Sequence, residues 1–167
     1  MNQNKSDIDI VAVSSPDHIR VVKELFIEYA RSLDFNLCFQ NFEKELAELP
    51  GEYSPPGGIL LLAMDEHHPA GCIALRRIDE FVCEMKRLYI KPEARGSGYG
   101  RTLTVELLRR ASALGYRTMR LDTVPSMKEA IELYTSLGFK KIPPYRENPV
   151  EGAIFMELDL TTGRNVL

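Results

Sequence analysis

The sequence lacks several features that would mark an unusual class of protein. It has no tryptophan and three cysteines, Cys38, Cys72 and Cys83, among 167 residues. An odd cysteine count without C-x-x-C spacing indicates neither a disulfide framework nor a zinc site. The adjacent histidines His67 and His68 would point to opposite sides of the chain, so no metal is expected.

Long apolar runs are also missing. No stretch approaches the roughly 18 apolar residues that cross a membrane, and the polar start at residues 1–7 does not resemble a signal peptide. We therefore predict a cytoplasmic protein with reduced thiols and no membrane partner.

An excess of positive charge is absent from the chain as a whole, but not from its middle. Lys and Arg number 21 against 24 Asp and Glu, and the resulting net charge of −3 argues mildly against a nucleic-acid partner. Residues 76–120 carry 11 positive and 5 negative side chains, so this segment sums to +6 and the remainder to −9. The asymmetry predicts that the middle of the chain meets an anion.

Hydrophobic periodicity divides the chain into alternating strands and helices. Ser15 and Pro16 predict a capped helix start, and Ser126 with Glu129 predicts a capping box before the last helix. The predicted helices cover 16–33, 42–49, 101–114 and 127–137. The predicted strands cover 8–13, 59–64, 70–78, 82–90, 118–123, 139–142 and 152–160.

These elements predict one domain of the α/β (α+β) class. The tight spacing of three strands between 59 and 90 indicates an antiparallel meander. About seven strands in a mostly antiparallel mixed sheet would be flanked by about four helices. The domain is expected over 8–160, with a flexible N-terminus at 1–7 and a tail at 161–167.

A glycine-rich turn at 95–101, R-G-S-G-Y-G-R, carries the most chemical information. Glycines allow a close backbone approach, and the free N–H groups at a helix start bind phosphate. Arg101 stands where a dinucleotide fingerprint needs glycine and where a P-loop needs lysine. The pattern that fits is R-x-x-G-x-G, from Arg95, Gly98 and Gly100; the alternative is a plain turn.

Together with a second motif, this turn resembles the GNAT superfamily of N-acetyltransferases. The segment M-K-R-L-Y-I-K-P-E-A-R-G-S-G-Y-G-R-T-L resembles the family's acetyl-CoA signature of strand, R/Q-x-x-G-x-G/A and helix. Downstream, Ala130, Tyr134, Gly138 and Phe139 match A-x-x-x-Y-x-x-x-G-F. The resemblance covers roughly 59–142.

The resemblance implies acetyl-CoA as the cofactor. The N–H of Leu88 or Tyr89 would donate to the thioester oxygen, although a ladder N–H can equally pair with the next strand. Met127 stands where the family often has asparagine, so that contact is missing or comes from Ser126 or Lys128. The implied cofactor-binding residues are Leu88, Tyr89, Ile90, Arg95, Gly96, Ser97, Gly98, Tyr99, Gly100, Arg101, Thr102, Ser126, Lys128 and Ala130.

Two side chains are candidates for the proton transfers that acetylation of an amine requires. The resemblance implies an acidic base on strand 82–90, which points to Glu84 acting through water; pairing with Lys86 and Arg87 is the alternative. It implies Tyr134 as the acid, with packing on a helix face as the alternative. The presence of both residues favours catalysis.

The acceptor pocket is expected between the N-terminal helices and the loop at 143–149. The helices would contribute Tyr29, Phe35, Leu37 and Phe39. Prolines in the loop would fix its polar side chains, unless the loop is only a connector. The predicted substrate-binding residues are Tyr29, Phe35, Tyr145, Arg146 and Asn148.

Two kinds of acceptor remain open. Arg146 in the pocket would favour a carboxylate on the acceptor, whereas acidic flanks would favour a polyamine or another cation.

The resulting expectation is an enzyme that moves an acetyl group to a primary amine of a small molecule by direct attack in a ternary complex. The alternatives are a non-catalytic acyl-CoA-binding regulatory module, and an acetyltransferase acting on a protein or peptide amine. The resemblance implies a homodimer somewhat more often than a monomer.

Overall fold

The computed structural model describes residues 8–37 and 41–162. Cys38, Phe39 and the predicted flexible terminus at 1–7 lie outside these residues. The helices are α1 (Pro16–Ser32), α2 (Phe42–Glu48), α3 (Tyr99–Ala113) and α4 (Lys128–Ser136), with short 3₁₀ turns η2 (Gly51–Tyr53) and η3 (Pro92–Ala94). The strands are β1 (Asp9–Ala12), β2 (Ile59–Asp65), β3 (His68–Arg77), β4 (Val82–Ile90), β5 (Thr118–Thr123), β6 (Lys140–Ile142) and β7 (Ile154–Asp159).

The described strands form one seven-stranded sheet in the order β1-β2-β3-β4-β5-β7-β6. Neighbours are antiparallel except β4 and β5, which run parallel. The prediction of a mostly antiparallel mixed sheet with four helices is confirmed. The elements run from Asp9 to Asp159, and the domain limits of 8–160 stay a prediction.

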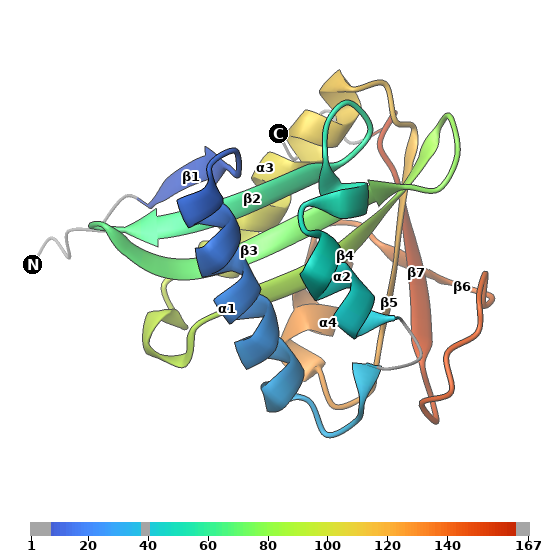
Figure 1. The fold of residues 1–167 in the computed structure, drawn as a ribbon. Helices are drawn as coiled ribbons and strands as arrows, with labels where there is room; N and C mark the ends of the chain where they lie inside the picture. The colour runs from blue at the N-terminus through green and yellow to red at the C-terminus, as the bar shows by residue number, and fades with distance from the viewer. Residues whose placement is uncertain (1–7, 38–40, 163–167) are drawn as a thin grey trace, which may run out of the picture.

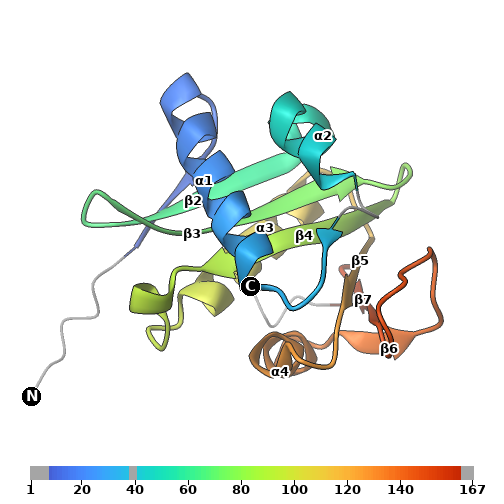
Figure 2. The same ribbon diagram turned by 60° about the horizontal axis from the view of Figure 1, so that its bottom comes forward.

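Helices cover both faces of the sheet (Figures 1 and 2), with α1 and α2 on one side and α3 and α4 on the other. Successive side chains of β2 point to opposite faces of the sheet and so contribute to both cores. Leu60 and Leu62 pack under α1, whereas Leu61 packs against α3. The core under α1 includes Val22, Leu25, Phe26, Cys72, Ala74 and Tyr89. The core under α3 includes Leu103, Leu107, Ala111, Ile73, Met85 and Met119.

The helix boundaries test the capping signals. The side chain of Ser15 accepts a hydrogen bond from the N–H of His18, as predicted. The capping box before α4 is wrong: the N-cap is Met127, and no side chain caps this helix. The N–H of Met127 donates to the carbonyl of Val124, so a turn extends to Met127 and the helix begins one residue later than predicted. Glu129 is therefore one position too early to complete the box.

Strands β4 and β5 separate partway along their length, and this separation positions the site. They pair only from Val82 to Glu84 on β4, while β4 itself continues to Ile90. In the β3–β4 register, Cys72 pairs with Tyr89 but Ala74 pairs with Lys86, so β4 carries one extra residue. This bulge includes Arg87, whose φ of 61° is left-handed. The part of β4 beyond Glu84 is therefore not paired with β5.

Candidate active site

The glycine turn leads into α3 with its backbone open to one side. Gly96 and Gly98 have φ values of 84° and 82°, which glycine adopts without strain, and no heavy atom would lie within 4 Å of an added Cβ at either. Arg95 donates from Nε to the Ile90 carbonyl at 3.0 Å, and its guanidinium lies 5.8 Å from the Tyr89 ring centre. The turn is therefore held against the end of β4.

A cavity of about 570 Å³ lies beside this turn, and we call it the glycine-turn cavity. Eleven of the predicted cofactor-binding residues line it: Leu88, Tyr89, Ile90, Arg95, Gly96, Gly98, Tyr99, Gly100, Ser126, Lys128 and Ala130. The sequence reasoning assigned no cofactor contact to six further lining residues: Tyr29, Ser32, Ala94, Met127, Glu129 and Leu133.

Three predicted cofactor-binding residues are not in this lining. Thr102 donates from its hydroxyl to the Gly98 carbonyl at 3.0 Å, and Arg101 donates to the hydroxyl of Ser136 on α4 at 2.9 Å. Ser97 is the exposed tip of the turn. In this structure the first two brace the turn and α3, and cofactor contact by all three stays a prediction.

An inner cavity of about 50 Å³ opens where β4 and β5 separate. It shares Tyr29, Leu88 and Met127 with the glycine-turn cavity, so the two meet at these residues. Its other lining residues are Phe35, Leu37, Met85, Lys86, Arg87, Leu121, Asp122, Thr123, Val124, Tyr134 and Asn148. Of the five predicted substrate-binding residues, Tyr29, Phe35 and Asn148 line this cavity, whereas Tyr145 and Arg146 do not.

Tyr134 and Thr123 bring hydroxyls to the inner cavity. The Tyr134 ring packs against Phe139 at 5.7 Å between centroids, so the packing alternative is also realised. Burial raises the pKa of Tyr134 above its ordinary value, so the phenol keeps its proton at neutral pH. Among the described residues, the buried Oγ1 of Thr123 has no hydrogen-bond partner.

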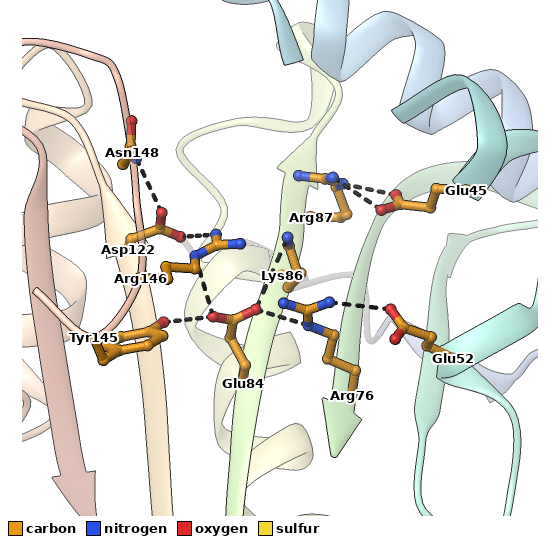
Figure 3. Close-up of polar contacts among 10 residues, drawn as sticks. All are labelled: Glu45, Glu52, Arg76, Glu84, Lys86, Arg87, Asp122, Tyr145, Arg146 and Asn148. Atoms are coloured by element: carbon orange, nitrogen blue, oxygen red, sulfur yellow. Dashed lines mark hydrogen bonds and ion pairs between the residues drawn. The ribbon is translucent and has the colours of Figure 1, made fainter. Parts of the chain in front are cut away.

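Glu84 lies in a buried ionic network (Figure 3). Its side chain is fully buried, and Arg76 Nε lies 2.9 Å from one carboxylate oxygen. Tyr145 donates its hydroxyl to the other oxygen at 2.5 Å. Arg146 Nε and Lys86 Nζ are more distant, at 3.6 and 3.9 Å. The carboxylate is thus surrounded by three cations and a phenol.

The pairing alternative for Glu84 holds in part. Lys86 faces Glu84, but Arg87 instead makes two hydrogen bonds to Glu45 of α2, at 2.8 and 2.9 Å. Because Cys83 and Met85 pack under α3, strand alternation turns Glu84 and Lys86 to the α1–α2 face. The bulge keeps Arg87 on that face as well.

Polar side chains of the loop at 143–149 contact Glu84 on β4 and Asp122 on β5. Arg146 donates to one oxygen of Asp122 at 2.6 Å, and Asn148 donates to the other at 3.0 Å. Tyr145 packs edge-on against Phe155 of β7. The loop is thereby tied to β4, β5 and β7.

A third space, the outer cavity, adjoins this network on the α1–α2 face. Its volume is about 270 Å³. It is lined by Asn41, Lys44, Glu45, Glu48, Pro50, Gly51, Glu52, Tyr53, Arg76, Lys86 and Arg146. Lys86 lines both this cavity and the inner one, so the two are neighbours.

The described part of the chain offers no group of three or more His, Cys, Asp or Glu side chains that could hold a metal ion. Over the same residues, no helix is both long and apolar enough to cross a membrane.

Comparisons with known proteins agree with this geometry. The family model of the acetyltransferase (GNAT) family matches residues 22–139. An uncharacterized N-acetyltransferase of Schizosaccharomyces pombe is 41% identical over 158 residues, covering 93% of this chain and 97% of the relative. A second, from Dictyostelium discoideum, is 30% identical and covers 89% and 97%.

Among solved structures, a Salmonella typhimurium protein determined with its cofactor acetyl-CoA has a TM-score of 0.70 at 20% identity, covering 92% of this chain and 94% of that one. The chain belongs to the acetyltransferase (GNAT) family, so the resemblance is confirmed. The enzyme class and cofactor follow from this membership: an N-acyltransferase that uses acetyl-CoA.

Proposed function

We propose that the protein transfers the acetyl group of acetyl-CoA to a primary amine of a small molecule, by direct attack in a ternary complex. The meeting of two cavities at Tyr29, Leu88 and Met127 carries this proposal. The larger cavity suits a cofactor and the smaller one an amine, and the strand separation lets them touch. A reacting pair held in this way loses little entropy in the transition state.

The residues of the glycine-turn cavity fit the parts of acetyl-CoA, which supplies an activated acetyl thioester. The N–H groups that begin α3 and the Arg95 guanidinium would bind the pyrophosphate. The backbone of Leu88 to Ile90 would hold the pantetheine arm, with Leu88 at the junction of the two cavities.

Tyr134 is the proposed acid. It lines the inner cavity and keeps its proton at neutral pH. The hydroxyl can therefore give its proton to a leaving thiolate.

We infer that Glu84 is a positioning residue. It contacts Arg76, Arg146 and Tyr145, and it is not in the lining of the inner or outer cavity. Proton transfer from the amine through water to Glu84 stays a prediction, which the pH profile of a Glu84→Gln variant tests.

The experiment that tests the function is a thiol-release assay with acetyl-CoA and a panel of amino acids, polyamines, aminoglycosides and peptides. We expect turnover with a small amine, because segment 33–37 and the 143–149 loop supply Phe35, Leu37 and Asn148 to a cavity of only about 50 Å³. Turnover with peptides alone would support a macromolecular acceptor. Acetyl-CoA binding without any thiol release would support a regulatory module.

The predicted homodimer and cytoplasmic location are part of the proposal. Sedimentation velocity checks the first, and fluorescence microscopy of a tagged chain checks the second.

A further inference from the structure

Three side chains form the junction between the glycine-turn cavity and the inner cavity, and they come from both faces of the sheet. Tyr29 lies on α1, Leu88 on β4, and Met127 at the start of α4. Helices α1 and α4 cover opposite faces (Figures 1 and 2). Among the described residues no others line both cavities, so a group that extends from one cavity into the other passes these three.

Two of the three junction side chains are held by the cores. The Tyr29 ring meets the Tyr89 ring edge-on at 6.0 Å between centroids and packs against the core under α1. Leu88 packs against the core under α3. Because close-packed interiors do not rearrange cheaply, these two sides of the junction are rigid.

Met127 differs from both. Its backbone is fixed, because its N–H donates to the Val124 carbonyl at 3.0 Å and its carbonyl accepts from the N–H of Ile131 at 3.1 Å. Its side chain is half-buried, belongs to neither core of the described chain, and makes no capping bond to α4. Shortening this side chain therefore widens the junction and removes little else.

The inner cavity has room for only a short acyl group. A cavity needs about 10–15 Å³ for each water-sized group that it holds, so a volume of about 50 Å³ accommodates about three to five such groups. An acetyl group has three non-hydrogen atoms, and the attacking nitrogen of an amine is a fourth. Each further methylene of a longer acyl chain needs space that the walls of the cavity must give up.

The walls behind the junction are committed to other contacts. Leu121, Val124 and Tyr134 are 2%, 3% and 7% exposed, so they are enclosed by the fold. On the polar side, Arg87 is bound to Glu45 by two hydrogen bonds. Displacing such side chains carries the cost of overpacking a core. The length of the acyl chain is therefore limited by the space that Met127 leaves.

We propose that Met127 determines which acyl group the enzyme transfers, because its side chain closes the junction to acyl groups as long as butyryl. This inference rests on the proposed attack at the junction. There the amine nitrogen forms a bond to the acyl carbon while the carbon–sulfur bond breaks, and the proton that the amine loses ends on the thiol. With the pantetheine arm in the glycine-turn cavity, the acyl chain has to extend past Met127 into the inner cavity.

The test compares acetyl-CoA, propionyl-CoA and butyryl-CoA, by calorimetric titration and as donors in the thiol-release assay with the best amine of the acceptor panel. Added methylenes improve binding where an apolar site has room for them. We expect the opposite in the wild-type chain: affinity and kcat/KM should both be lower for butyryl-CoA than for acetyl-CoA, kcat/KM by at least about tenfold. Propionyl-CoA should lie between them, since a methionine side chain is adaptable.

Two variants of Met127 locate the effect. Met127→Ala removes three non-hydrogen atoms from the junction, so we expect the preference for acetyl-CoA over butyryl-CoA to fall by about tenfold. Met127→Leu conserves the volume of the side chain and should keep the preference.

Leu133→Ala is the matched control. Leu133 lies on the same helix and loses the same number of atoms, but it lines the glycine-turn cavity and not the inner one. This variant should change the affinities for the three donors to the same degree. Thermal melting checks that each variant is folded.

The possible outcomes separate the inference from the proposed function. Equal kcat/KM values for the three donors in the wild-type chain overturn the inference and leave acetyl transfer intact. A preference that is as strong in Met127→Ala as in the wild-type chain, or that is lost equally in Leu133→Ala, overturns the assignment to Met127. Absence of thiol release with every amine contradicts the proposed function, and the calorimetric ranking of the three donors then decides the inference alone.

Discussion

Tyr134 lines the inner cavity, and its ring packs against Phe139. Tyr134→Phe removes the hydroxyl and keeps the packing. We expect kcat to fall by about 100-fold or more, as for loss of a general acid, with acetyl-CoA affinity nearly unchanged. Steady-state kinetics and calorimetric titration measure the two quantities.

Tyr116→Phe is the matched control for this change. The Tyr116 hydroxyl donates to the Gly57 carbonyl, and Tyr116 does not line the inner cavity. Its loss should lower stability by about 1 kcal/mol and leave kcat unchanged. Wild-type turnover in Tyr134→Phe would remove Tyr134 from the mechanism.

Glu84 combines complete burial with contacts to Arg76, Arg146 and Tyr145. Glu84→Gln leaves those cations without their common anion, so we expect it to lower stability by about 3–5 kcal/mol. Urea denaturation measures this loss. A positioning role predicts a loss of stability and an unchanged shape of the pH–rate profile. A large fall in kcat with full stability and loss of the acidic limb of the pH–rate profile would instead identify Glu84 as the base.

The glycine turn holds Gly98 at a φ of 82°, and Gly115 at the other end of α3 has a φ of 93°. An added methyl group would meet no atom within 4 Å at either position. Alanine at each should therefore cost a similar backbone strain of about 1–2 kcal/mol, visible in thermal melting.

Only Gly98 lines the glycine-turn cavity. We expect Gly98→Ala to weaken acetyl-CoA binding by about tenfold, because its methyl group enters the space that the turn presents to a ligand. Calorimetric titration of both variants checks this. Equal affinities in Gly98→Ala and Gly115→Ala would show that the turn does not bind the cofactor.

Helix α2 has no fully buried residue, and Glu45 ties it to the sheet through Arg87. Glu45→Gln leaves the buried Arg87 guanidinium without its anion, so we expect a loss of about 3 kcal/mol and faster amide hydrogen exchange in α2. Lys44→Gln breaks only an exposed pair with Glu48 at 4.0 Å and should change stability by less than about 1 kcal/mol. Equal exchange in both variants would contradict this account of α2.

Acetyl-CoA should stabilise the domain by linkage, because it binds the folded chain alone. At 100 times its dissociation constant the gain is about 2.7 kcal/mol, measured as a rise in Tm. Acetyl-pantetheine lacks the pyrophosphate expected at the glycine turn and should give a smaller rise at equal concentration. No shift at millimolar acetyl-CoA would contradict the cofactor assignment.

How far the sequence could predict this protein depends on how local each feature is. The turn at 95–101 and the pattern from Ala130 to Phe139 are short continuous segments, so both can be recognised in the sequence itself. Most of their predicted cofactor-binding residues line one cavity. The network around Glu84 joins residues as far away as Tyr145, and only the tertiary register brings them together. No local pattern encodes such contacts.

The charge asymmetry shows the same limit. The surplus of +6 at 76–120 predicts contact with an anion, but it does not say where the individual cations lie. In the structure Arg95 lines the glycine-turn cavity, but Arg76, Lys86 and Arg87 lie on the α1–α2 face. The charge sum does not reveal this division, because strand alternation and the β4 bulge decide which face a side chain reaches.

The narrow junction between the inner and glycine-turn cavities has a consequence for divergence and for engineering. Among the described residues, the two cavities have only Tyr29, Leu88 and Met127 in common. Under the proposed function, we expect substitutions elsewhere around the inner cavity, at Phe35 or Asn148 for example, to change which amine is recognised while the lining of the glycine-turn cavity stays the same. Evolution or protein design could therefore change the acceptor amine while acetyl-CoA remains the acetyl donor.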